Sequence, residues 1–107
     1  MYSFGDIIII NSPFSDNQGS KRRPAVVIKD TNDKDLLIAK VTSQSYYTEF
    51  DITIKEWKQA GLISASVIRT HKIQTIYNSL IFSAIGRLTP VDLQLVRRGL
   101  LDLVTDL

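Results

Sequence analysis

Two apolar runs near the start of the chain enclose a polar segment. The runs are Ile7 to Ile10 and Ala25 to Ile28, both rich in β-branched residues. Short runs of this kind, bounded by turn formers, indicate buried strands, and neither run alternates as a half-exposed strand would. Proline has no N–H to give to a sheet, so the second strand is predicted to begin at Pro24. The segment between the runs is therefore a loop held at both ends.

Further extended segments follow the second strand. A third strand is expected from Leu36 through Thr42, and residues 47–54 alternate apolar with polar positions as a strand with one wet side does. Residues 66–76 and 80–88 are also extended in pattern. Between them, Thr53 and Glu56 stand at the spacing of a capping box, which predicts a short helix over 54–60 that ends at Gly61.

The end of the chain has the periodicity of a helix. Thr89 offers a hydroxyl cap, Pro90 fits the first turn, and Asp92 lies three residues after the cap. Six apolar residues then recur at helical spacing and form one stripe, which is expected to pack on the sheet or on a partner. They are Leu93, Val96, Leu100, Leu103, Val104 and Leu107. Many short strands with a terminal helix predict a mainly β (α+β) fold, a small, strongly bent β-barrel or sheet decorated by helices.

Composition narrows the class of protein further. A chain of 107 residues is about one domain, and it contains no cysteine for disulfides or thiolate metal sites. Its longest apolar run is four residues, far short of the roughly 20 that cross a bilayer, so no membrane segment and a cytoplasmic location are expected. The formal charge of +2 is too small to indicate a nucleic-acid partner by itself.

Several common chemistries find little support. His71 is the only histidine and the acids form no ligand cluster of the usual spacing, so no metal site is predicted. No Gly-x-Ser-x-Gly elbow is present for a nucleophilic serine, and Gly19 stands without the glycine-rich junction that nucleotide binders need. No cofactor is expected. The groups that remain as candidates for a functional site are arginine, hydroxyl groups and histidine.

The polar loop ends in three consecutive cations, Lys21, Arg22 and Arg23. In RNA cleavage the adjacent 2′-hydroxyl is the nucleophile, so a protein need only align it, move protons and stabilise charge on phosphate. A guanidinium suits the last task because it stays charged and makes two parallel bonds to phosphate oxygens. Pro24 would hold Arg23 rigidly, whereas Arg22 should point to the other side. The alternative is that this basic tripeptide is a solvated turn.

Other polar residues could join the same site. Thr42 and Ser43 end the third strand, where they could donate hydrogen bonds to phosphate or simply form an exit turn. Arg69 and His71 are two residues apart and share a face of an extended chain, so His71 could exchange protons beside Arg69, or it could be an exposed residue on a basic rim. Tyr46 and Tyr47 could stack on bases.

These motifs together resemble the MazF/PemK toxins. The resemblance is carried in one order along nearly the whole chain, by Gly5-Asp6-Ile7, Lys21-Arg22-Arg23-Pro24-Ala25-Val26-Val27, Val41-Thr42-Ser43-Gln44, Ser66-Val67-Ile68-Arg69, Lys72-Ile73-Gln74-Thr75-Ile76 and Ile85-Gly86-Arg87-Leu88. It implies one SH3-like β-barrel domain over residues 1–107 and a homodimer. It also implies metal-independent cleavage of single-stranded RNA, typically messenger RNA, that leaves a 2′,3′-cyclic phosphate and a 5′-hydroxyl.

The resemblance also assigns roles to residues. The arginine before the proline, which acts in proton transfer and phosphate stabilisation in this family, matches Arg23, and the threonine that closes the third strand matches Thr42. Some members use an arginine and an acid two residues later. These positions match Arg69 and His71, so here a histidine replaces the acid.

Four further sets of expectations complete the hypothesis. RNA contacts are expected from Lys21, Arg22, Ser43, Gln44 and Lys72. The loop over residues 11–20 is expected to act as a lid, with Phe14, Ser15, Asp16 and Gly19 within it. A cognate antitoxin with a flexible, acidic segment is implied as partner. Two rivals to the endoribonuclease remain: a nucleic-acid-binding module that cleaves nothing, and a gyrase-poisoning inhibitor of the same fold.

Overall fold

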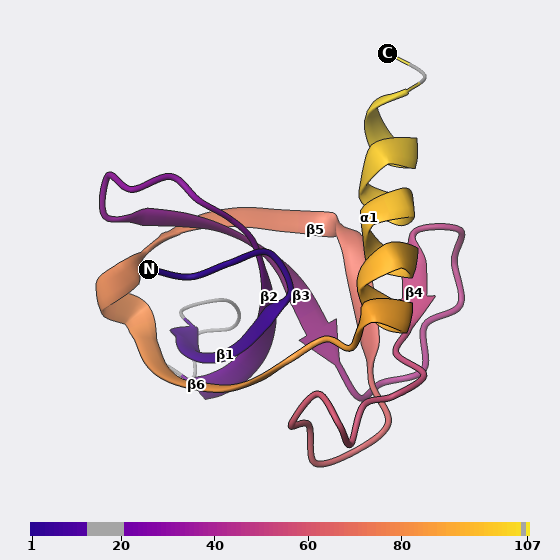
Figure 1. Ribbon diagram of the computed structural model, residues 1–107, viewed down its shortest axis with the longest axis horizontal. Coiled ribbons are helices and arrows are strands. Elements are labelled where there is room, and N and C mark those ends of the chain that lie inside the picture. Colours follow the sequence, from indigo (N-terminus) through magenta and orange to yellow (C-terminus); the bar gives the residue numbers. More distant parts are fainter. Residues whose placement is uncertain (13–20, 106) are drawn as a thin grey trace.

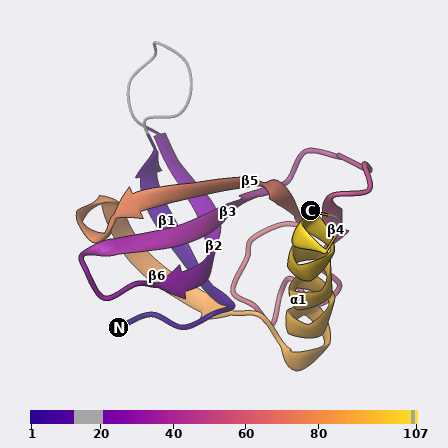
Figure 2. The same cartoon turned by 90° about the horizontal axis from the view of Figure 1, so that it is seen from above.

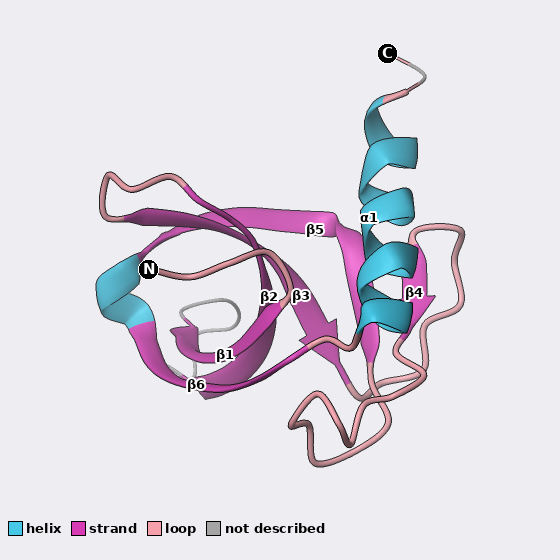
Figure 3. Cartoon of the chain, viewed as in Figure 1, coloured by secondary structure: helices cyan, strands magenta, loops and turns pink. Residues whose placement is uncertain are grey.

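A single antiparallel sheet of six strands forms the body of the molecule in the computed structural model, which describes residues 1–12, 21–105 and 107. In chain order the strands are β1 (Asp6–Ser12), β2 (Lys21–Asp30), β3 (Asp35–Thr42), β4 (Asp51–Thr53), β5 (Val67–Tyr77) and β6 (Ile81–Arg87). A 3₁₀ turn, η1 (Asn78–Leu80), joins the last two strands, and the helix α1 (Pro90–Val104) ends the chain (Figures 1 and 3).

The sheet bends strongly but does not close. Its strand order is β4-β5-β3-β2-β1-β6, so β4 and β6 are edges with no pairing between them among the described residues. Figure 2 shows the strands curving around a common interior while α1 lies to one side, next to β4. The bent sheet and terminal helix predicted from the sequence are thus confirmed, as a sheet that stays open.

Both faces of the central strands are covered by apolar side chains, as continuous β-branched runs require. One cluster, the helix-side core, joins Ile7, Val26, Val41, Ile54, Ile68 and Val96 with their buried neighbours Ala39, Ala60, Leu62 and Leu88. The opposite face of the same strands carries a second cluster: Ile8, Ile10, Ala25, Val27, Leu36, Ile38 and Ile76. No helix in the described part of the chain is long and apolar enough to span a membrane.

The second strand starts earlier than predicted. It begins at Lys21 rather than at Pro24, and Pro24 pairs with Ile9 inside it. Pairing with β3 starts only at Ala25, so this part of β2 is bonded on one side and tolerates a residue without an N–H. The consequence is that the three cations extend a strand rather than a loop.

The predicted strand over 47–54 is reduced to the three residues of β4. A local turn replaces its first half, because the Asp51 carboxylate accepts hydrogen bonds from the Thr48 amide at 3.0 Å and the Thr48 hydroxyl at 2.6 Å. The Asp51 amide in turn donates to the Thr48 carbonyl.

The helix predicted over 54–60 is wrong, and this segment forms turns. Its free amides are satisfied from another element, since the fully buried carboxylate of Asp92 accepts from the Lys55 and Glu56 amides at 2.9 and 2.8 Å. The Glu56 carboxylate accepts a hydrogen bond from Thr89 instead of completing a capping box with Thr53. Long-range partners therefore override a local signal.

The terminal helix is confirmed with Thr89 at its N-cap position and Pro90 in its first turn. The predicted hydroxyl cap is not formed, because the Thr89 hydroxyl donates to the Glu56 carboxylate instead. Val96 is fully buried in the helix-side core, and Leu93 and Leu100 pack against it. The end of the predicted stripe is different, because Val104 is 56% exposed and Leu107 fully exposed. The first three turns of α1 thus anchor it to β4 and β5, and its last turn projects beyond the sheet (Figure 1).

Candidate functional site

A pocket of about 620 Å³ lies where β2 begins and β3 ends. Its wall on one side is the segment 61–66, and strands β1 and β6 contribute Ile9 and Ile85. The remaining lining residues are those that the sequence singled out, together with one that it did not: Arg22, Arg23, Pro24, Lys40, Val41, Thr42, Ser43 and Gln44. Five predicted site residues are therefore neighbours around one cavity.

Strand register explains how Arg23 and Thr42 meet. The last residue pair between β2 and β3, at this end of the two strands, is Ala25 opposite Lys40. Arg23 precedes Ala25 by two residues and Thr42 follows Lys40 by two, so the period of two along each strand puts both side chains on the face of that last pair. Both are partly buried. Two positions 19 residues apart in the sequence thus become neighbours across a strand pair.

The described lining of the pocket is positively charged. Three cations, Arg22, Arg23 and Lys40, line it, and none of the described lining residues is acidic. Partial burial lowers the pKa of Lys40, and the nearby charges of Arg23, Arg69 and Lys72 lower it further. Because these cations repel one another, an anion placed among them is favoured. The pocket has the electrostatics of a phosphate or carboxylate site.

Arg22 does not turn wholly away from the site as expected. Its guanidinium carbon lies 3.6 Å from the ring centroid of Phe82 on β6, and the residue still lines the pocket. Phe82 is 52% exposed, so the stacked pair presents a flat, charged surface at the rim.

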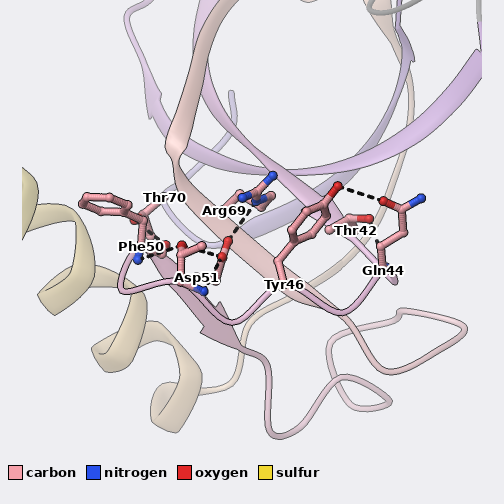
Figure 4. Close-up of polar contacts among 8 residues, drawn as sticks. Thr42, Gln44, Tyr46, Phe50, Asp51, Arg69 and Thr70 are labelled. Atoms are coloured by element: carbon pink, nitrogen blue, oxygen red, sulfur yellow. Dashed lines mark hydrogen bonds and ion pairs between the residues drawn. The ribbon is translucent and has the colours of Figure 1, made fainter.

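Arg69 is held by two side chains, those of Asp51 and Tyr46, as Figure 4 shows. Its Nε donates to Asp51 Oδ1 at 2.9 Å, and its guanidinium carbon lies 3.6 Å from the ring centroid of Tyr46. The two charged side chains are almost closed to solvent, at 11% exposed for Arg69 and 1% for Asp51. Arg69 also pairs with Lys40 in the sheet register, and this places its backbone beside the pocket although it is not among the lining residues.

Asp51 stays ionised in this environment. Burial alone would raise the pKa of its carboxyl, but the hydrogen bonds from Thr48 and Arg69 outweigh burial and hold the pKa below its ordinary value of 3.8. The acid that pairs with Arg69 therefore comes from β4 and not from the position two residues after Arg69. Sequence reasoning missed Asp51 because β4 pairs with β5 only in the folded chain.

The cation–π contact of Arg69 with Tyr46 and two hydrogen bonds link this ion pair to the pocket. The Tyr46 hydroxyl donates to Gln44 Oε1 at 3.0 Å, and the Gln44 amide donates to Thr42 Oγ1 at 3.1 Å (Figure 4). Among the described residues the Thr42 hydroxyl accepts this bond and donates to no partner, so its proton is available to a ligand. Tyr46 thus connects Arg69 on β5 with Gln44, which follows β3.

The other predicted site residues are not brought into the pocket. His71 is exposed, with its ring centroid 5.1 Å from that of Phe50, and Lys21 and Lys72 are exposed on β2 and β5. An irregularity in the β3–β5 pairing between Ala39 and Lys40 leaves residues 70–72 without partners on β3, so the shared face expected for Arg69 and His71 is interrupted. The predicted lid residues Phe14, Ser15, Asp16 and Gly19 lie outside the described residues.

Lys40 is the lining residue that sequence reasoning missed. It stands alone in an otherwise apolar strand, Leu36-Leu37-Ile38-Ala39-Lys40-Val41, where period two puts it on the face of Leu36 and Ile38. A lone lysine in such a run was the available signal. Within the described part of the chain, no group of three or more His, Cys, Asp or Glu side chains is placed to hold a metal ion.

The fold is shared with solved toxin structures. An endoribonuclease bound to its cognate antitoxin, from a mycobacterial species, superposes with a TM-score of 0.78 at 10% identity over 95% of this chain and 93% of that one. The toxin MazF-mt6 of Mycobacterium tuberculosis gives 0.74 at 17% identity, over 91% and 93%. MazE-MazF from Deinococcus radiodurans gives 0.76 at 20% identity, over 96% and 95%. No curated protein matches the chain.

The sequence itself settles the family. Residues 3–104 match the model of the PemK-like, MazF-like toxins of type II toxin-antitoxin systems. This span includes every described strand, the whole of α1 and all the residues that line the pocket. The chain belongs to this toxin family, and the resemblance seen in its motifs is confirmed.

Proposed function

We propose that this toxin is an endoribonuclease that cleaves single-stranded RNA without a metal ion. The observation that carries the proposal is the pocket at the β2–β3 end, where three cations and the Thr42 hydroxyl converge without an acidic neighbour among the described lining residues. The substrate's own 2′-hydroxyl is the nucleophile, so the protein's tasks are alignment, proton transfer and charge stabilisation. The products are a 2′,3′-cyclic phosphate and a 5′-hydroxyl.

Arg23 and Thr42 have the central roles in this proposal. The Arg23 guanidinium binds the two non-bridging oxygens of the scissile phosphate, where negative charge grows in the transition state. The Thr42 hydroxyl donates to the same phosphate. Ser43 and Gln44 at the pocket edge, with Arg22, Lys21 and Lys72 around it, contact the flanking RNA, and the Arg22–Phe82 pair offers a face on which a base stacks.

Arg69 and His71 have less direct roles. Because the carboxylate of Asp51 neutralises the guanidinium of Arg69, the role of Arg69 is to order the ring of Tyr46 beside the pocket. His71 stays a candidate for proton transfer only if RNA binding brings its exposed ring to the substrate.

Incubation of purified protein with a long single-stranded RNA in EDTA tests the proposal. Cleavage at short sites with 5′-hydroxyl ends is expected, and Arg23→Ala should slow it by at least about 100-fold, as removal of one transition-state donor does. Arg98→Ala is the matched control, because Arg98 is an exposed helix arginine whose side chain is 80% accessible. Binding without cleavage would favour the binding-module alternative. Inhibited DNA supercoiling with intact RNA would favour a gyrase inhibitor.

The antitoxin expected for this toxin belongs to the same proposal. Two of the three solved structures compared above are complexes with an antitoxin or with MazE. A flexible segment whose carboxylates enter the cationic pocket would exclude RNA by occupying the phosphate position. Antitoxin added before RNA should therefore block cleavage. A small acidic protein is expected to be encoded just upstream of this reading frame, and it is the molecule to test.

We also propose a homodimer. The last turn of α1 and the residues after it carry three apolar side chains that the sheet leaves uncovered, Leu101, Val104 and Leu107, each at least half exposed. Size-exclusion chromatography with light scattering should give twice the chain mass of 12.1 kDa. A monomer at micromolar concentration would contradict this.

A further inference from the structure

The leaving group of RNA cleavage needs a proton. When the 5′-oxygen departs from phosphorus it is an alkoxide, and protonation of this oxygen by a positioned acid lowers the barrier. An acid that serves in many cycles must lose and regain its proton in the pH range where the protein works.

The described lining residues offer few groups for this task. The family resemblance assigns proton transfer to Arg23, but a guanidinium does not deprotonate in proteins, so Arg22 and Arg23 remain protonated at any accessible pH. The hydroxyls of Thr42, Ser43, Ser64 and Ser66 are neutral and far weaker acids than an ammonium group. His71 does not line the pocket, and neither does any described carboxylate. The remaining group is the ammonium of Lys40.

The position of Lys40 suits proton transfer rather than structural pairing. In the sheet register it lies opposite Ala25 on one side and Arg69 on the other, on the strand face that it shares with Thr42. Among the described residues no carboxylate is within ion-pair distance of it, since the acids of the three ion pairs bind Arg69, Arg87 and Arg98. Its ammonium group therefore has its protons available to a ligand in the pocket.

We propose that Lys40 is the general acid that protonates the leaving 5′-oxygen, a role that rests on the proposed endoribonuclease function. In this step the O2′–P bond forms as the P–O5′ bond breaks. The 2′-hydroxyl releases its proton to solvent water, Lys40 Nζ transfers one proton to O5′, and Lys40 regains a proton from solvent. Nothing is oxidised or reduced, and the products are the cyclic phosphate and the 5′-hydroxyl. The lowered pKa of Lys40, caused by burial and by Arg23, Arg69 and Lys72, makes its ammonium a stronger acid.

A substrate that needs no protonation separates this role from simple phosphate binding. Cleavage sites are first mapped on a long RNA, and an oligonucleotide with the mapped sequence is then made with sulfur in place of the 5′-oxygen at the scissile bond. A thiolate leaves without a general acid. Lys40→Met and Lys40→Arg should each slow cleavage of the oxygen substrate by at least about 100-fold. Both should cleave the sulfur substrate within about 10-fold of the wild-type rate.

The pH dependence of the wild-type protein gives a second readout that needs no variant to fold. Its rate on the oxygen substrate should fall as the pH rises through the lowered pKa of Lys40, below the ordinary lysine value of 10.5. Its rate on the sulfur substrate should show no such fall. Lys29→Met and Lys29→Arg are matched controls, because Lys29 is an exposed lysine on β2 that does not line the pocket.

Every outcome of these experiments supports or overturns the proposed acid role of Lys40. Equal losses on the two substrates, or a Lys40→Arg variant as fast as the wild type on the oxygen substrate, would overturn the acid role while leaving an endoribonuclease. The same alkaline fall on both substrates would overturn it too. A wild-type protein that cleaves no RNA would overturn the proposed function, and the role of Lys40 with it.

Discussion

Asp51 shows how much one residue of a short edge strand contributes to the site. Its carboxylate binds the Arg69 guanidinium and two groups of Thr48, while only 1% of its side chain is exposed. The pair orders Arg69 under the ring of Tyr46, and Tyr46 in turn bonds Gln44 at the pocket edge.

Asp51→Asn should destabilise the protein by about 3 kcal/mol, because it leaves the nearly buried charge of Arg69 without its partner. Urea unfolding followed by circular dichroism measures the change. Asp102→Asn is the matched control, since it breaks an exposed pair with Arg98 of 80% and 64% accessibility and should cost less than about 0.5 kcal/mol. Equal effects of the two substitutions would show that the Asp51 pair is no stronger than a surface pair.

The pKa of Asp51 predicts an acid dependence of that difference. A carboxyl whose folded pKa lies below the unfolded value stabilises the fold fully above the unfolded value, and this stabilisation is lost as the pH falls through the folded pKa. The gap in unfolding free energy between wild type and Asp51→Asn should therefore be constant above the ordinary value of 3.8 and shrink below it. Unfolding titrations from pH 7 down to pH 2.5 test this, and a gap that grows in acid would contradict it.

At the scale of elements, the wall of the pocket depends on a crossing between the turns at 54–62 and strand β6. Gly61 has a left-handed φ of +93°, and a Cβ built there would lie 2.3 Å from the Ile85 carbonyl oxygen. A Cβ on Gly86 would lie 1.9 Å from the Ala60 carbonyl oxygen. Backbone meets backbone at this crossing, so neither side has a flexible group that yields.

Gly86→Ala should therefore destabilise the protein by at least about 2 kcal/mol and weaken RNA binding, since the segment it displaces lines the pocket. Thermal unfolding and fluorescence anisotropy with a labelled RNA measure the two effects. Gly99→Ala on α1 is the control: its Cβ would meet the flexible end of Ile52 at 3.0 Å, and alanine favours a helix, so we expect a change within about 1 kcal/mol. A Gly86→Ala variant as stable as the control would show that the close backbone contact at Gly86 does not exclude a side chain.

At the scale of the whole molecule, the placement of charge matters more than its sum. The net charge is only +2, yet three cations line one pocket with no described acid among them. Elsewhere, acids pair with Arg69, Arg87 and Arg98 and neutralise them. This segregation favours anion binding at one end of the sheet.

RNA binding should accordingly weaken with salt. For single strands each neutralised phosphate contributes about −0.7 to the slope of log affinity against log salt, so three pocket cations predict a slope of about −2. Arg23→Ala should make the slope shallower by about 0.7. Anisotropy with an oligonucleotide that has 2′-deoxyribose at the cleaved position measures binding without cleavage. A slope near zero would show that the cations do not contact phosphate.

The sequence by itself determined the features that local pattern encodes. The apolar runs specified β1, β2 and β3, and the proline and apolar stripe specified α1, because burial of such runs is favourable in any compact arrangement. The motifs around Arg23, Thr42 and Arg69 indicated the toxin family and the first candidates for its site. Their side-chain chemistry needed no tertiary information.

Only the tertiary structure decided what depends on contacts between distant segments. Asp92 satisfied the amides of residues 55 and 56 and replaced a predicted helix with turns. The sheet register placed Lys40 beside Arg69 and across from the strand of Arg23, and the pairing of β4 with β5 supplied Asp51. The irregularity at Ala39 separated His71 from the pocket. Hydrogen-bond and charge partners 18 to 37 residues apart leave no periodic trace in the sequence, so the fold alone selects among them.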